Sequence, residues 1–205
     1  MENTNAEVWT IWSLTPSWSP STVTWKILNW RQYWSTAKDQ FTYSSAIPAW
    51  TISLWINKNT VTGWRIFWKT QLSVTDVITI TLTSSKIALI INDSADLNSS
   101  ASTLSDNTWY HYAITWDWSN VIVYKNWAVE TTQSSTKTVQ ANAQQFSIWN
   151  TNFDTSQPYA GIVDELWIWT RALSSWEISQ LYNSWNWLTY PFTISSTNLS
   201  FLAFM

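Results

Sequence analysis

Short apolar runs, separated by polar stretches, recur along the chain. The clearest run, residues 50–57, alternates large apolar residues with smaller or polar ones, and this pattern predicts a β-strand. Two further runs, 77–82 and 87–91, are close enough to form a hairpin across Ser84 and Ser85. The strands expected on this basis cover residues 50–57, 65–67, 77–82, 87–91, 109–116, 121–124, 146–148 and 161–169.

The polar stretches between these runs predict loops. Residues 1 to about 36 are rich in Ser, Thr and Pro, and are interpreted as a linker with one or two entering strands. Residues 92–107 and 150–157 are also polar, and both are expected to be loops.

One helix signal follows the last strong strand. Ser174 and Glu177 have the spacing of a capping box, in which each side chain bonds the other residue's backbone N–H. Ile178, Leu181 and Tyr182 then follow at helical i, i+3, i+4 spacing. Many short strands with one late helix favour an all-β sandwich or jelly roll.

The glycine and tryptophan counts do not fit such a fold. The chain has 20 Trp and only 2 Gly among 205 residues, whereas average glycine usage of ~7% predicts about 14. An all-β chain needs many turns, and several turn types require a residue that tolerates positive φ. The missing glycines therefore need an explanation.

Tryptophan stands at positions where a turn favours glycine. Trp118 follows Asp117 and Trp127 follows Asn126, each between strand-like runs; with glycine these pairs would be strong hairpin signals. We hypothesise that UGA codons, read as glycine in some bacteria, have here been translated as tryptophan. The positions assigned to glycine are 9, 12, 18, 25, 30, 34, 68, 118, 127, 149, 167, 176, 185 and 187.

The remaining tryptophans fit apolar strand patterns, except Trp64, which follows Gly63 and is ambiguous. The alternative hypothesis is a truly Trp-rich protein that binds sugar or cell wall through aromatic platforms. The tryptophans interpreted as genuine are Trp50, Trp55, Trp109, Trp116 and Trp169.

Charge and cysteine content exclude several classes of protein. Charged residues make up 11% of the chain and the net charge is -3, so the basic surface of a nucleic-acid-binding protein is missing. The chain has no cysteine, which excludes disulfides and Cys-based zinc sites. The first eight residues are not typical of a signal peptide, and no apolar run reaches the ~20 residues of a membrane helix.

Three blocks of sequence, residues 50–56, 109–128 and 161–183, resemble the LamG-like (laminin G/concanavalin A-like) jelly-roll family in order and spacing. The third block contains Gly-Ile-Val-Asp-Glu-Leu and then Arg-Ala-Leu-Ser. The resemblance implies a two-sheet antiparallel jelly-roll sandwich over residues 20–190, with one short C-terminal helix. Residues 1–19 would form a linker or N-terminal extension, and residues 191–205 a C-terminal strand or linker.

The resemblance also implies a module of a larger multidomain protein, outside the cell or on its surface. Related family-16-type glucanases share this fold and carry a Glu-x-Asp-x-Glu motif or a form one residue longer, because retaining glycosidases need two carboxylates ~5 Å apart. No glutamate of this chain lies in such a motif, and His111, the single histidine, is interpreted as a structural strand residue. The five glutamates are Glu2, Glu7, Glu130, Glu165 and Glu177.

Asp164, which lies in the closing strand, is the metal candidate. By resemblance to the glucanases it could bind calcium together with backbone carbonyls, since calcium takes several hard oxygen ligands. The alternative is an internal hydrogen bond or an ion pair with Arg171.

The loop after residue 149 is the ligand candidate, because Asn150, Asn152 and Asp154 offer side-chain acceptors beside Phe153. The expected function is a non-catalytic binding or adhesion module that recognises carbohydrate or protein, without nucleic-acid binding or membrane insertion. A structural spacer domain and a diverged glycoside hydrolase are the alternatives.

Overall fold

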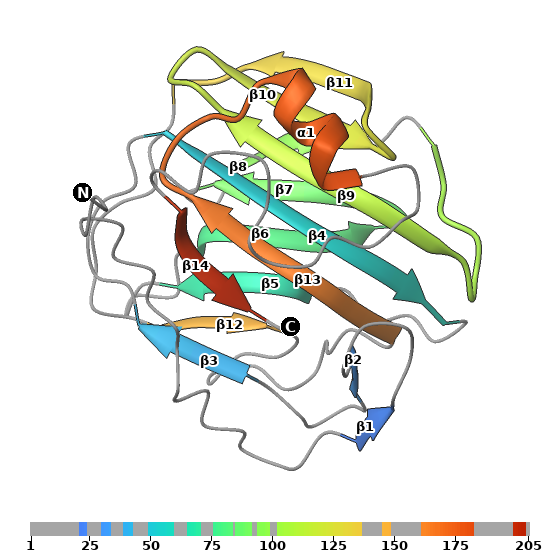
Figure 1. Cartoon of the computed structure of the whole chain (residues 1–205). Coiled ribbons are helices and arrows are strands. Elements are labelled where there is room, and N and C mark those ends of the chain that lie inside the picture. Colours follow the sequence, from blue (N-terminus) through green and yellow to red (C-terminus); the bar gives the residue numbers. More distant parts are fainter. Residues whose placement is uncertain are drawn as a thin grey trace, which may run out of the picture.

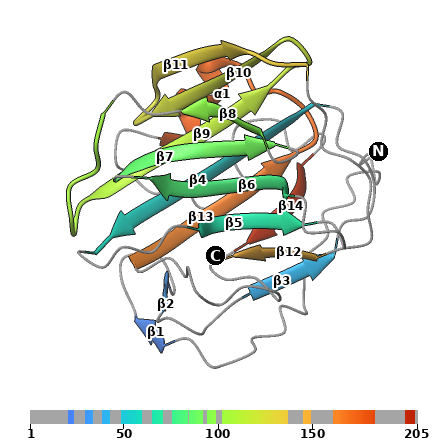
Figure 2. The ribbon, with the colours of Figure 1, turned by 180° about the vertical axis from the view of Figure 1, so that it is seen from behind.

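The protein is a sandwich of two antiparallel β-sheets with one helix on its outer side (Figure 1). The computed structural model describes residues 21–23, 30–33, 39–42, 49–59, 65–70, 76–83, 85–91, 94–98, 102–136, 145–148, 161–182 and 199–203. In the opposite view, the strands of the second sheet lie in front of those of the first (Figure 2). The predicted all-β, two-sheet fold is confirmed.

The first sheet has eight strands in the described part of the chain, in the order β1-β2-β13-β4-β9-β10-β11, with β14 also paired to β13. Every pairing in it is antiparallel. Its strands are β1 (Ser21–Val23), β2 (Trp30–Tyr33), β4 (Trp50–Lys58), β9 (Trp109–Trp116), β10 (Asn120–Lys125), β11 (Ala128–Ser134), β13 (Gly161–Trp169) and β14 (Leu199–Ala203).

The second sheet has six described strands in the order β3-β12-β5-β6-β7-β8, again antiparallel throughout. The β6–β7 hairpin turns at Ser85, as the apolar pattern predicts. These strands are β3 (Asp39–Thr42), β5 (Arg65–Thr70), β6 (Asp76–Thr83), β7 (Lys86–Ile91), β8 (Ser94–Asn98) and β12 (Gln145–Ile148).

The main core lies between the two sheets. In β4, alternate side chains point inward, because successive residues of a strand face opposite sides of a sheet. Leu54 and Ile56 from this strand join Ile114 of β9 and Ile80 and Leu89 of the second sheet in one buried cluster. The alternation that predicts the strands is therefore also the pattern that fills the core.

A second, smaller core covers the outer face of the first sheet. The helix α1 (Ser175–Tyr182) lies across that face (Figure 1). Its Ile178 and Leu181 pack with Trp167 and Trp169 of β13 and Tyr124 of β10. This helix explains why β4 and β9 are buried on both faces rather than one.

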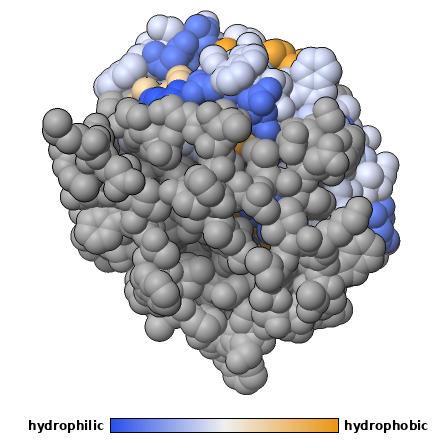
Figure 3. Space-filling view, viewed as in Figure 1, coloured by the Kyte–Doolittle hydropathy of each residue, from blue (hydrophilic) through white to orange (hydrophobic). Residues whose placement is uncertain are grey.

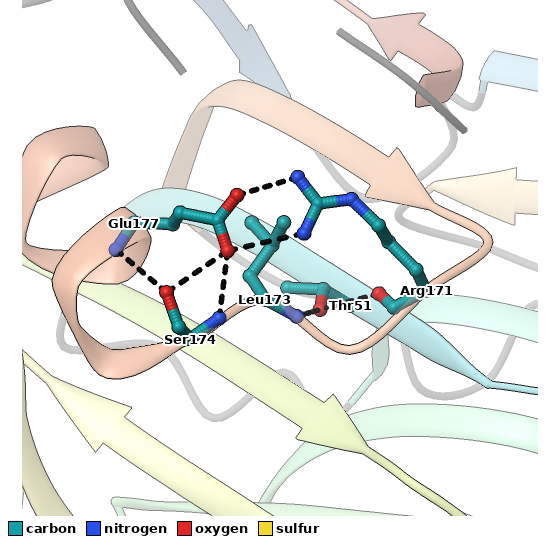
Figure 4. A network of polar contacts seen from close by, with 5 residues as sticks. All are labelled: Thr51, Arg171, Leu173, Ser174 and Glu177. Carbon is teal, nitrogen blue, oxygen red and sulfur yellow. Dashed lines mark hydrogen bonds and ion pairs between the residues drawn. The ribbon is translucent and has the colours of Figure 1, made fainter. Parts of the chain in front are cut away.

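The predicted capping box begins this helix (Figure 4). The Ser174 hydroxyl accepts a hydrogen bond from the Glu177 N–H at 3.3 Å, and the Glu177 carboxylate accepts one from the Ser174 N–H at 2.9 Å. Arg171 approaches the same carboxylate with two guanidinium nitrogens, at 2.5 and 3.0 Å. The connection from β13 to α1 is thus held by its own side chains.

One expectation from the sequence is wrong, and one of the two alternatives for Asp164 is not realised. The polar stretch 92–107 contains a strand, β8, which pairs with β7 at the edge of the second sheet. Arg171 pairs with Glu177 and not with Asp164. A polar edge strand has no apolar alternation, because its side chains need not be buried, and this explains why β8 was not predicted.

Candidate functional site

Asp164 lies at a β-bulge in β13. The register against β4 shifts between Asp164 and Trp167, and Glu165 in this bulge has φ 45°. Left-handed backbone at a non-glycine residue is uncommon, and such strain often accompanies a functional site. The Asp164 carboxylate accepts a hydrogen bond from the Glu165 N–H at 2.8 Å. The internal hydrogen bond considered as an alternative for Asp164 is therefore present.

The bulge places two carboxylates next to each other in the chain, that of Glu165 buried and that of Asp164 half-buried. Burial raises the pKa of Asp164 to about 7, although the hydrogen bond from the Glu165 N–H opposes this change. Burial, and then the neighbouring Asp164 charge, raise the pKa of Glu165 to about 8. Both groups are therefore difficult to ionise in this place, and a nearby positive charge would lower both pKa values.

The donor set fits calcium only in part. Asp164 and Glu165 could supply carboxylate oxygens, which hard cations such as calcium prefer, but calcium takes six to eight oxygen ligands. In the part of the chain that the structure describes, no group of three or more His, Cys, Asp or Glu side chains could hold a metal ion. The other ligands would therefore be backbone carbonyls or other neutral oxygens.

His111 lies on β9 opposite Trp55, on the sheet face that α1 covers. Its Nε2 is 2.8 Å from the Ser53 hydroxyl oxygen, and its ring packs near Trp55 and Tyr182. Burial lowers the pKa of His111 to about 3, so the ring is neutral at ordinary pH. Because His111 and Ser53 are both about 1% exposed, a substrate could not reach this pair, in agreement with a structural role.

A second polar group lies on the inner side of the first sheet, where the strands reach the loop after β8. We call Ser102, Tyr110, Lys125 and Glu130 the Glu130 cluster. The Ser102 hydroxyl bonds the Glu130 carboxylate, and Lys125 donates to the same hydroxyl at 2.6 Å while its Nζ lies 4.5 Å from the centre of the Tyr110 ring. One oxygen of Glu130 is buried and accepts no hydrogen bond from a described residue.

Sequence reasoning missed this cluster, although one signal for it was present. Val121 and Val123 point into the main core, and Lys125 is the next residue in that inward series. A charged residue at an inward position marks the point where the core ends and a polar site can begin. Glu130 could not be assigned to it, since β11 has mostly exposed polar residues and no apolar alternation.

The predicted ligand loop lies outside the described residues. This applies to Asn150, Asn152 and Asp154, and these three positions remain a prediction. The described residues therefore contain two candidate sites. One is the pair of Asp164 and Glu165, and the other is the Glu130 cluster.

Two packed antiparallel sheets with a helix on the outer face define a lectin-like jelly-roll domain. The chain belongs to the concanavalin A-like lectin/glucanases superfamily, whose family model matches residues 31–179. No curated protein matches the chain in sequence.

Several solved structures share the fold at low identity. Domain 4 of the arabinanase AbnA from Geobacillus stearothermophilus, solved with arabinotriose, is 19% identical with a TM-score of 0.64, covering 80% of this chain and 81% of that one. A pentraxin from Limulus polyphemus is 19% identical with a TM-score of 0.56, covering 71% and 75%. The binding domain of botulinum neurotoxin serotype G is 14% identical with a TM-score of 0.60, covering 85% of this chain and 47% of that one.

Among the described residues, no helix combines the length and the apolar character that a membrane-spanning helix requires.

Proposed function

We propose that the protein is a non-catalytic carbohydrate-binding module, and that the Glu130 cluster is its ligand site. The observation that carries this proposal is the Glu130 carboxylate, which pairs with Lys125 and Ser102 through one oxygen while its other oxygen accepts no hydrogen bond from a described residue, all beside the ring of Tyr110. Sugar sites combine an aromatic surface with a few convergent polar groups. These four side chains supply both.

The Glu130 cluster lies where β10 and β11 approach the loop after β8. In Figure 2 the β10–β11 hairpin extends past β8, the edge strand of the second sheet. The outer side of the first sheet, away from the cluster, is the side that Figure 3 shows, and its described surface around α1 and β11 is mostly hydrophilic with only small separate hydrophobic areas. That described surface offers no large apolar patch of the kind that marks a protein interface.

The acidic groups favour binding over hydrolysis. Glycosidases use two carboxylates on either side of the scissile bond. Asp164 and Glu165 are adjacent in sequence, the first half-buried and the second buried, and neither belongs to the glucanase acidic motif. The names of two similar structures, a complex with arabinotriose and a putative carbohydrate-binding protein from Bacteroides ovatus, point in the same direction.

A glycan array followed by calorimetry with the best oligosaccharide tests the proposal. Glu130→Gln and Tyr110→Ala are expected to weaken binding at least tenfold, each losing a contact to the ligand. Thr132→Ala is the matched control, because Thr132 is exposed on the same strand and pairs with Ile122 of the outer face. Unchanged affinity in the Glu130 and Tyr110 variants would reject this site.

A second pair of variants tests the loop predicted from the sequence. If Asn152→Ala and Asp154→Ala abolish binding while Glu130→Gln does not, the ligand site is the loop. No binding to any glycan would favour the spacer domain instead, and release of reducing sugar from β-glucans would favour a hydrolase.

A further inference from the structure

Two tryptophans occupy left-handed backbone positions in hairpin turns. Trp118 has φ 78° and Trp127 has φ 69°. Of the other described non-glycine residues with positive φ, Ser85, Asn107 and Asn126 are small and polar, and Glu165 lies in the β13 bulge. A bulky aromatic residue at positive φ is an outlier, whereas glycine adopts this geometry without a steric penalty.

The turn at Trp127 has little freedom to avoid this geometry. Lys125 pairs with Ala128, so the loop contains only Asn126 and Trp127, both with positive φ. Asn126 is also fixed to β9, since its N–H donates to the His111 carbonyl at 2.8 Å and its side-chain oxygen accepts the His111 N–H at 3.1 Å. A two-residue loop with positive φ at both positions is the type I′ turn, for which Asn-Gly is the preferred pair.

The turn at Trp118 is held by its neighbours in the same way. The Asp117 carboxylate accepts hydrogen bonds from the N–H groups of Ser119 and Asn120, at 3.0 and 2.8 Å, and the Asp117 N–H donates to the Asn120 carbonyl at 3.2 Å. These bonds hold the backbone on both sides of Trp118. Its ring contacts Trp116, with centroids 5.0 Å apart, but is 51% exposed, and the Trp127 ring is 55% exposed.

We propose that the natural protein carries glycine at positions 118 and 127, with UGA codons that its source reads as glycine. This inference is independent of the proposed function, and it removes both exposed rings as candidate sugar platforms. It does not extend to every position assigned from the sequence. Trp167 is 2% exposed within β13 and packs against Trp169, so the structure gives no support to glycine there.

The other positions assigned to glycine fall into two groups, those that the structure describes and those outside the described residues. Trp176 is exposed but helical, and Trp30 and Trp68 lie in β2 and β5, so the backbone gives no reason for glycine at these three. The remaining assigned positions, 9, 12, 18, 25, 34, 149, 185 and 187, lie outside the described residues.

The gene and the protein from its natural source test the proposal directly. The expected codons are UGA at 118 and 127, and UGG at Trp50 and Trp116. Trypsin cleavage after Lys125 and Lys137 gives a peptide of residues 126–137, in which position 127 is the only tryptophan. The expected peptide mass is that of glycine at 127; a UGG codon or the mass of tryptophan there would overturn the proposal.

Variants of the recombinant chain test the physical reason separately. Trp127→Gly and Trp127→Ala both remove the ring, but only glycine removes the Cβ that disfavours positive φ. We expect Trp127→Gly to raise the Tm by roughly 2–4 °C above both the parent and Trp127→Ala. At Trp176, which is helical, the order should reverse, because alanine is the better helix former. Equal Tm values for Trp127→Gly and Trp127→Ala would refute the backbone argument.

Discussion

The hydroxyl of Thr51 accepts a hydrogen bond from the backbone N–H of Leu173 at 2.8 Å, across 122 positions of sequence. The same hydroxyl donates to the Arg171 carbonyl at 2.9 Å (Figure 4). Thr51 is completely buried in β4. This one side chain therefore ties the start of the helix connection to the middle of the first sheet.

Replacing Thr51 by valine should destabilise the protein measurably. The variant keeps the shape of the side chain but leaves the buried Leu173 N–H without its acceptor, at a cost of about 1–3 kcal/mol. For a chain of this size the Tm should fall by roughly 2–4 °C per kcal/mol, which calorimetry would detect. Thr132→Val, at an exposed position, is the control and should change stability by less than about 0.5 kcal/mol. Equal losses in the two variants would contradict this role of Thr51.

The capping box offers a second, independent test of the same connection. Ser174→Ala removes the acceptor for the Glu177 N–H, and should cost about 1 kcal/mol in the free energy of unfolding. Glu177→Gln keeps an acceptor for the Ser174 N–H but loses the charge that pairs with Arg171. Because this pair is partly exposed, its loss should cost no more than about 1 kcal/mol. Urea titration of both variants would measure the two contributions, and a larger loss for Glu177→Gln would show that the ion pair dominates.

Features that depend on neighbouring residues were the easiest to predict from the sequence. The strands at 50–57 and 109–116, the hairpin at Ser85 and the capping box at Ser174 all depend on local alternation or spacing, and the structure contains each of them. The sequences of the two polar edge strands, β8 and β11, lack that alternation. A strand at the edge of a sheet can contribute few side chains to the core, so an apolar residue at every second position is not required.

The candidate sites were harder to predict, since they depend on contacts between distant segments. Glu130 meets Ser102 only because β11 folds back beside the loop after β8. The left-handed φ of Glu165 has no local sequence signal of the kind that Asn126 provides. The family resemblance, and no local pattern, points to Asp164, whereas the bulge in β13 that sets it beside the buried Glu165 has no sequence signal.

Stability should rise as the pH falls from about 8 to about 6. The pKa of Asp164 is raised to about 7 and that of Glu165 to about 8, so the folded state binds more protons than the unfolded state in this range. Lowering the pH therefore favours folding. The stabilisation that these two carboxyl groups give to the folded state reaches its full value once the pH is below their pKa values in the unfolded chain, near 4. Thermal melts from pH 8 to pH 6 would check this, and a Tm that falls in that interval would contradict the raised pKa values.

Below about pH 6 two other groups should act in the opposite direction. The pKa of His111 is lowered to about 3 by burial, so the unfolded state takes up its proton first and folding becomes less favourable as the pH falls below about 6.5. The pKa of Glu177 is lowered to about 2, chiefly by its hydrogen bond to Arg171, and its contribution is lost between about pH 4.5 and 2. Between pH 6.5 and 4.5 folding still takes up about two protons at Asp164 and Glu165 against the one that it releases at His111, so the Tm should reach its maximum only near pH 4 to 4.5. His111→Gln should steepen the rise in Tm between pH 6.5 and 4.5, because it removes the opposing group, and should leave the change between pH 8 and 7 in place.

Calcium should stabilise the protein chiefly at the alkaline end of this range, if the bulge in β13 holds it. A divalent cation binds the ionised forms of Asp164 and Glu165, and so relieves the repulsion and burial that raise their pKa values. We expect millimolar calcium to raise the Tm at pH 8 by several degrees over the value in chelator, and to have less effect at pH 5, where protons compete for the carboxylates.

Asp164→Asn keeps an oxygen that can accept the Glu165 N–H but removes one charge. Without calcium this variant should be more stable than the parent at pH 8, and its response to calcium should be lost. A calcium response that survives in both Asp164→Asn and Glu165→Gln would place the ion elsewhere, whereas no response in the parent chain would mean that the buried carboxylates are held by protons alone.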